Sequence, residues 1–277
     1  MYNDENPRLL VAGSSVIARD FYDELRQDQL DVEFVDAPLP LDSAYDLIFV
    51  FTEDELMEKC LWVNKLEDAV SAKGFICVNV DGVGLSEIQE KVNAEVVGVN
   101  FCYPVTASPF MEIIETERNQ AGHVEGLFNW AKQRLNKDPY IVKGGISVRA
   151  YMLAAMAREA FYLVDKGYAS VESIDRACRN DAGYYLPFTG NYLYMDLMGT
   201  VAYALVMKDL NPELSNSQDV PDWFERMVQN GKIGMKSLSG LYKYKEGDLE
   251  KWEFIVRGFS KEINTLIIKY KKEYAEG

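Results

Sequence analysis

RLLVAGSSVIARDFYDELRQDQLDVEFVD (residues 8–36) decides the fold of the N-terminal half of this chain. Residues 8–13 are an apolar run that stops at a glycine, and residues 14–25 carry apolar side chains at helical spacing. Residues 32–35 are a second apolar run, which ends at Asp36. This succession of strand, tight turn, helix and strand predicts an α/β unit built on a parallel sheet.

The same spacing is that of a dinucleotide-binding unit. In such a unit the amides at the start of the helix hold a pyrophosphate, and an acidic residue after the second strand holds the ribose hydroxyls. Asp36 has the place of that acid, but of the three glycines only Gly13 is present, and Ser15 and Ala18 have the other two places. Ser15 puts a Cβ where the backbone must approach the pyrophosphate. Two interpretations stay open: the turn binds NAD, or Gly13 is only a turn residue and Asp36 only a strand cap.

The pattern then continues as alternating strands and helices. Residues 46–51 are an apolar run that leads to Thr52-Glu53-Asp54. Residues 55–71 have the pattern of an amphipathic helix, which we expect Lys73-Gly74 to end, and residues 75–78 have the pattern of a buried strand. From Val148 onward the pattern is helical. We therefore predict an α/β Rossmann-like domain over residues 1–143 and an all-α domain over residues 144–277.

Composition excludes several kinds of function. The net charge of −15, with 44 acidic and 29 basic residues, argues against a nucleic-acid partner. Four dispersed cysteines and one histidine make a zinc site or a disulfide framework improbable, so we expect no metal. The N-terminal residues lack a secretion signal, and no apolar run is long enough to span a membrane. We expect a cytoplasmic protein with no membrane partner.

A resemblance to a known family rests on GVNFCYPVTASPFMEII, residues 98–114. This segment resembles the active-site strand of the 3-hydroxyacyl-CoA dehydrogenases, in which a His-Phe-x-Asn-Pro run is followed, twelve residues after its His, by a Glu. Asn100 stands at the place of that His and Glu112 at the place of that Glu, while Tyr103 replaces the Asn.

The helical half resembles the family more closely. AFYLVDKGYASVESIDRA (160–177) matches a helix, a glycine turn and a serine-capped helix of the family, and MVQNGKIGMKSLSGLY (227–242) resembles its Gly-x-x-Gly-x-Lys-Ser signature. The resemblance implies a C-terminal domain of the 6-phosphogluconate dehydrogenase-like type that forms a homodimer. It also implies NAD as cofactor, with Glu53 at the place of a matching Glu, and a small-molecule or acyl substrate in fatty acid metabolism.

The chain departs from the family where the family binds its substrate. Nine residues, 37–45, stand where the family has a helical hairpin that contributes to the coenzyme A site. Asp81 and Gly82 replace serines that touch the substrate hydroxyl, and the family's substrate-contacting Asn falls on Arg149 or Ala150. We therefore do not expect this chain to bind an acyl-CoA through the contacts that the family uses.

The replacement at residue 100 concerns the proton. Oxidation of an alcohol by hydride transfer requires a base, and a carboxamide does not accept a proton at ordinary pH. Glu112 is either a repurposed acid/base or a plain strand-end carboxylate, and Tyr103 is either a phenol that acts as acid/base or a packing aromatic. His123 we interpret as a surface residue at a helix start.

Three functional hypotheses follow. In the first, the chain lacks the family's catalytic mechanism and acts as a binding or partner subunit. In the second, it is an active NAD(P)-dependent oxidoreductase on a 3-hydroxyacyl or related hydroxy-acid substrate, with Tyr103 or Glu112 repurposed. In the third, it is a structural module whose helical half mediates assembly.

Overall fold

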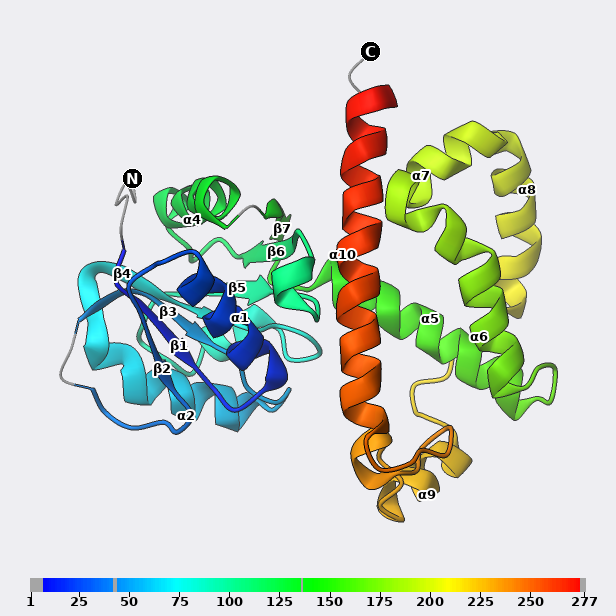
Figure 1. The fold of residues 1–277 in the computed structure, drawn as a ribbon, viewed down its shortest axis with the longest axis horizontal. Coiled ribbons are helices and arrows are strands. Elements are labelled where there is room, and N and C mark those ends of the chain that lie inside the picture. The colour runs from blue at the N-terminus through cyan, green and yellow to red at the C-terminus, as the bar shows by residue number, and fades with distance from the viewer. Residues whose placement is uncertain (1–6, 42–43, 136, 275–277) are drawn as a thin grey trace. The chain divides into compact units, whose positions relative to one another are not determined.

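The computed structural model describes residues 7–41, 44–135 and 137–274. The chain divides into two units, Met1–Tyr151 and Met152–Gly277, which are described one by one (Figure 1). Residues 1–6, on which the expectation of no secretion signal rests, lie outside the described residues, as do residues 42–43 of the short connection.

The first unit is built on one seven-stranded sheet. Its strand order is β2-β1-β3-β4-β5-β6-β7, and neighbours are parallel except β5 and β6, which are antiparallel. The strands are β1 (Leu9–Ala12), β2 (Val32–Val35), β3 (Tyr45–Val50), β4 (Val70–Val78), β5 (Val96–Asn100), β6 (Phe110–Glu115) and β7 (Asp138–Lys143).

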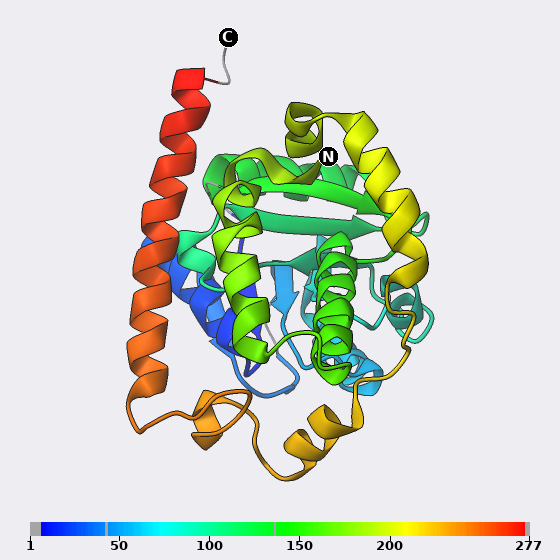
Figure 2. The ribbon, with the colours of Figure 1, turned by 90° about the vertical axis from the view of Figure 1, so that its right-hand side faces the viewer.

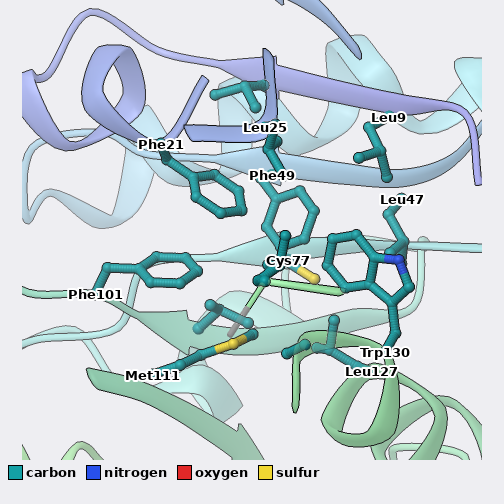
Figure 3. Packing of buried hydrophobic residues seen from close by; sticks show 14 of the residues in the cluster. Leu9, Phe21, Leu25, Leu47, Phe49, Cys77, Phe101, Met111, Leu127 and Trp130 are labelled. Carbon is teal, nitrogen blue, oxygen red and sulfur yellow. The ribbon is translucent and has the colours of Figure 1, made fainter. Parts of the chain in front are cut away.

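Helices cover both faces of this sheet. Leu9 of β1 packs in one cluster with residues of α1 (Val16–Gln27) and α4 (Ala121–Arg134), as Figure 3 shows around Phe49. Leu10, the next residue, packs in the other cluster with residues of α2 (Leu56–Leu66) and α3 (Leu85–Gln89). Side chains alternate along a strand, so a strand covered on both faces is apolar throughout, which explains the unbroken apolar runs of the sequence.

One boundary differs from the expectation. Residues 55–71 were expected to form one helix ended by Lys73-Gly74, but α2 ends at Leu66 and β4 begins at Val70. Gly74 lies inside β4, where a Cβ would come within 2.7 Å of the carbonyl oxygen of Asp46. The glycine therefore marks a close approach of two strands and not a helix end.

The second unit is helical (Figure 2). Its helices are the greater part of α5 (Val148–Asp165), then α6 (Val171–Asn180), α7 (Leu186–Met198), α8 (Thr200–Leu210), α9 (Asp222–Gln229) and α10 (Asp248–Tyr274). Gly167 has φ +72° after α5, and Ser170 caps α6 by accepting from the N–H of Ser173. Among the described residues, no helix has the length and apolar character that would let it cross a bilayer. The predicted fold class is confirmed.

Candidate functional site

The turn after β1 lies where the strand order of the sheet reverses. The chain passes from β1 to β2 on one side and then to β3 on the other side of β1. Ligands of such sheets bind outside the carboxyl ends of the strands at this point. Gly13 has φ +128° there, and a Cβ on it would come within 2.0 Å of the carbonyl oxygen of Phe51, so only glycine allows this turn.

The other residues expected at a nucleotide site follow neighbouring strands. Ser15 is the N-cap of α1, and its Oγ accepts from the N–H of Ala18 at 3.1 Å. The exposed Asp36 follows β2, whose last residue, Val35, accepts from the N–H of Gly13 at 3.0 Å. Glu53 is exposed beyond the end of β3. The topology therefore collects Gly13, Ser15, Asp36 and Glu53 at one edge of the sheet.

An asparagine joins the ends of β3 and β4. The Oδ1 atom of Asn79 accepts from the N–H of Thr52 at 3.0 Å, and its Nδ2 atom donates to the carbonyl of the same residue at 3.0 Å. The Nζ atom of Lys59, which is fully buried, donates to the carbonyl of Asn79 at 2.9 Å. Burial lowers the pKa of Lys59, and the charge of Asp54 opposes that shift. No sequence signal distinguished this lysine from others on an amphipathic helix.

Asn100 makes the same kind of bridge one strand further. Its Oδ1 atom accepts from the N–H of Val80 at 3.0 Å, and its Nδ2 atom donates to the carbonyl of Val80 at 2.5 Å. Nδ2 also lies 3.0 Å from Oε2 of Glu112 and 3.1 Å from Oγ of Ser147. Since Asn100 is 3% exposed, its hydrogen-bonding groups serve the protein interior.

Glu112 is the centre of this group. It lies opposite Asn100 in the β5–β6 pair and is fully buried. Besides Asn100, three groups donate to it: Ser147 Oγ at 2.6 Å, Tyr140 OH at 3.0 Å and the backbone N–H of Arg149 at 3.1 Å. Each carboxylate oxygen thus accepts two hydrogen bonds, which satisfies a buried charge. Burial and the charge of Glu112 raise the pKa of Tyr140. Sequence reasoning missed Ser147 and Tyr140.

Two positions at which the chain departs from the family meet in space. Nη1 of Arg149 lies 3.1 Å from Oδ1 of Asp81, and the two side chains are 31% and 38% exposed. Ala150 is the alternative match for the family's Asn. Its N–H donates to Oγ of Ser147 at 3.0 Å, so Ser147 caps the start of α5. The hydrogen-bonded side chains at the ends of β4 and β5 therefore extend from the buried Glu112 to a partly exposed ion pair.

Tyr103 lies in the loop that follows Asn100. Asp20 accepts from the N–H of Val105 at 2.6 Å in this loop, and Nζ of Lys137 donates to the carbonyl of Val105 at 2.6 Å. Lys137 also pairs with Glu24 at 2.7 Å. Lys137, which lies directly before β7, thus binds the main chain of this loop and a carboxylate of α1.

His123 differs from its expected surface position. Its ring stacks on Phe75 with centroids 4.9 Å apart, and Nδ1 lies 2.9 Å from Oε2 of Glu95. The side chain is only 16% exposed. The residue does stand in the first turn of α4, but it packs against β4 as a partner of Glu95.

Comparisons with known proteins support the family resemblance. Residues 148–244 match the family model of the 3-hydroxyacyl-CoA dehydrogenase C-terminal domain. The 5-formyl-3-hydroxy-2-methylpyridine 4-carboxylate 5-dehydrogenase of Mesorhizobium japonicum is 24% identical over 206 residues, which are 73% of this chain and 66% of that protein. The human mitochondrial hydroxyacyl-coenzyme A dehydrogenase is 25% identical over 207 residues, which are 72% of this chain and 64% of that protein.

A solved structure extends the likeness over nearly the whole chain. The crystal structure of a 5-formyl-3-hydroxy-2-methylpyridine 4-carboxylic acid 5-dehydrogenase, described as an NAD+ dependent dismutase, superposes with a TM-score of 0.86 at 18% identity. The superposition covers 95% of this chain and 98% of that one. The helical half of the chain thus matches the C-terminal domain of the 3-hydroxyacyl-CoA dehydrogenases, and these relatives, together with the Rossmann-like sheet, support the resemblance of the whole chain to that family.

Proposed function

We propose that this protein binds NAD in its first unit, lacks the family's catalytic mechanism and acts as a binding or partner subunit. The observation that carries this proposal is the closed set of hydrogen bonds around Asn100. A buried carboxamide that already joins two strands neither accepts the proton of an alcohol nor turns toward a substrate. We also propose that the protein acts in the cytoplasm.

Binding of NAD is supported by the turn at Gly13. Glycine is required there, and the turn opens a helix at the point where the strand order reverses. The first N–H groups of a helix lack acceptors within it, and Ser15 satisfies only that of Ala18. The N–H groups of Val16 and Ile17 fit a pyrophosphate oxygen, and Asp36 after β2 fits the ribose hydroxyls. The residues present therefore fit a dinucleotide.

Calorimetric titration with NADH tests this part. Asp36→Ala should weaken NADH at least tenfold, because the loss of a carboxylate that accepts from two hydroxyls costs about 1.5–3 kcal/mol. Asp31→Ala is the matched control, since Asp31 is an exposed acid just before β2 and hence at the other edge of the sheet. An unchanged affinity in Asp36→Ala, or no heat with the unmodified protein, would reject NAD binding at this turn.

A second candidate function is an active oxidoreductase on a small substrate without coenzyme A. It is supported by the superposition over 95% of this chain on a dehydrogenase of a pyridine carboxylic acid, and by the short connection of residues 37–45. Tyr103 or Glu112 would then handle the proton. NADH formation from 3-hydroxybutyryl-CoA and from free 3-hydroxy acids separates the two candidates. Turnover that disappears in Tyr103→Phe or Glu112→Gln would establish the second.

Assembly as a homodimer through the helical unit completes the proposal. Among the described residues, helices α5 to α9 contain no buried residue, although they are rich in large apolar side chains. Tyr192, Leu197 and Val201 are 80%, 72% and 75% exposed. Exposed apolar side chains in this number are typical of an interface. A second copy of the chain is the partner that the family resemblance implies.

A further inference from the structure

Arg149 combines a fixed main chain with a reachable side chain. Its N–H donates to Oε1 of Glu112 at 3.1 Å, and Glu112 is fully buried. The adjacent Ser147 caps the same helix start and donates to Oε2 of Glu112 at 2.6 Å. The root of the Arg149 side chain is therefore anchored on β6, while 31% of the side chain is exposed.

Among the described residues, the guanidinium group of Arg149 has one ion-pair partner, and several of its N–H donors are left for a ligand. Its Nη1 atom lies 3.1 Å from Oδ1 of Asp81, in the segment that follows β4. A guanidinium group carries five N–H donors in a planar fork, so this single contact leaves an edge for another carboxylate. Since ion pairs with partly exposed members contribute little to stability, Asp81 can also give way to a competing carboxylate.

The surrounding charges leave room for only one carboxylate of a ligand. Lys59 lies 3.8 Å from Asp54, and the charges of Asp81, Glu58 and Glu53 also act on Lys59, so this lysine is already surrounded by carboxylates and Arg149 is the cation of this group with donors left. The charge of Glu112 is covered by its own four donors. A polyphosphate would need several free cations, which this group does not supply, whereas one carboxylate matches the free edge of one guanidinium group.

We propose that Arg149 determines substrate specificity by binding the carboxylate of a small molecule, and that Asp81 holds the guanidinium group when no substrate is present. This inference rests on the second candidate function, whose substrate class it names. It places a free carboxylic acid, and not a coenzyme A thioester, at the carboxyl ends of β4 and β5. Asp81 then acts as a competitor of the substrate, and removal of its charge strengthens binding.

The test titrates matched pairs of probes by calorimetry. The carboxylates are 3-hydroxybenzoate, 3-hydroxybutyrate and pyridine-4-carboxylate, each compared with its carboxamide, and each is added to the protein alone and to the protein with saturating NADH. At least one carboxylate should bind at least tenfold more tightly than its carboxamide. Arg149→Gln should abolish this preference, Arg149→Lys should keep part of it, and Asp81→Asn should strengthen carboxylate binding severalfold.

Arg8→Gln is the matched control variant. Arg8 forms an ion pair with Glu33 at 2.6 Å, its side chain is 40% exposed, and it precedes β1 at the opposite edge of the sheet. This variant should keep the carboxylate preference. Equal binding of carboxylates and carboxamides, an undiminished preference in Arg149→Gln, or no carboxylate binding by either the unmodified protein or Asp81→Asn would overturn the inference. Carboxylate binding through Arg149 without any NADH binding would instead leave the inference standing and reject the proposed cofactor.

Discussion

Asn100 and Val80 are joined by a pair of hydrogen bonds that continues the sheet beyond its last backbone pairing. The side-chain amide of Asn100 accepts from the N–H of Val80 and donates to its carbonyl, as a facing strand would do. Backbone pairing of β4 with β5 ends at Val78 and Gly98. Asn79 repeats the arrangement with Thr52 between β4 and β3. Asparagine at the family's histidine position therefore has an architectural role.

This relationship predicts that Asn100→Asp is strongly destabilising. The new carboxylate keeps the acceptor of the pair but loses the donor to the carbonyl of Val80, and it places a second negative charge beside the buried Glu112. A broken buried network of this kind costs about 3–5 kcal/mol. Urea unfolding of the variant at neutral pH measures the loss.

Asn79→Asp provides the comparison for that variant. It removes the same donor from the pair with Thr52, but the nearby charge is the ammonium group of Lys59. We therefore expect a smaller loss, of about 1–2 kcal/mol. Equal losses in the two variants would show that the charge of Glu112 does not govern residue 100.

Restoration of the histidine should not restore the chemistry. In Asn100→His one imidazole nitrogen reaches only one of the two backbone groups of Val80, so a buried polar group loses its partner at a cost of about 1–3 kcal/mol. The family resemblance also implies that contacts to the substrate are replaced, at Asp81 and at Arg149 or Ala150. We expect no NADH formation from 3-hydroxybutyryl-CoA, as measured by absorbance. Brisk turnover in this single variant would refute the structural role assigned to the carboxamide.

Glu24 predicts a distinctive pH dependence of stability. Burial, opposed by Lys137, raises the pKa of Glu24 from 4.5 to about 7 in the folded protein. The folded state then holds a proton that the unfolded state releases, so this group's contribution to stability is present below pH 4.5 and is lost as the pH rises to about 7. Relative to Glu24→Gln, the unmodified protein should lose up to about 3 kcal/mol over this range.

Glu33 provides the control of opposite sign. Hydrogen bonds from Arg8 and Tyr45 lower the pKa of Glu33, so its contribution is present above the ordinary pKa and is lost as the pH falls. Chemical unfolding of Glu24→Gln, Glu33→Gln and the unmodified protein is measured from about pH 3.5 to about pH 8. This range spans the ordinary pKa of glutamate and the raised pKa of Glu24. A Glu24 profile that slopes in the same direction as that of Glu33 would show that Lys137 outweighs burial.

The sequence predicted those parts of the molecule that depend on local patterns. Unbroken apolar runs identified β1, β3 and the end of β4 because these strands are buried on both faces. Helix ends at Gly167 and Ser170 were readable because φ and capping requirements select those residue types. The prediction that Lys73-Gly74 ends a helix was wrong, because the sequence alone does not distinguish a glycine inside a strand from a glycine after a helix. What separates them is the close approach of Gly74 to β3, which is a tertiary contact.

The site was less predictable for the same reason. The family spacing put Asn100 and Glu112 at the places of a His and a Glu but did not predict their hydrogen bond. Tyr140 and Ser147 reach Glu112 from 28 and 35 residues further along the chain, and only the strand order brings them together. The contact of Asp81 with Arg149 joins residues 68 positions apart. Each had been identified as a departure from the family, but their pairing depends on the fold.

The apolar face of the helical unit yields the last prediction. A helix stabilises a domain mainly by burying an apolar stripe, and α7 and α8 leave theirs exposed within one chain. If a second copy covers this surface, Leu197→Glu and Val201→Glu each place a charge in the interface and should convert a dimer to a monomer in size-exclusion chromatography with light scattering. Lys208→Glu is the control on α8, because Lys208 is an exposed cation outside the apolar set. A monomeric unmodified protein would reject the homodimer, and dimers that persist in both glutamate variants would place the interface on other helices.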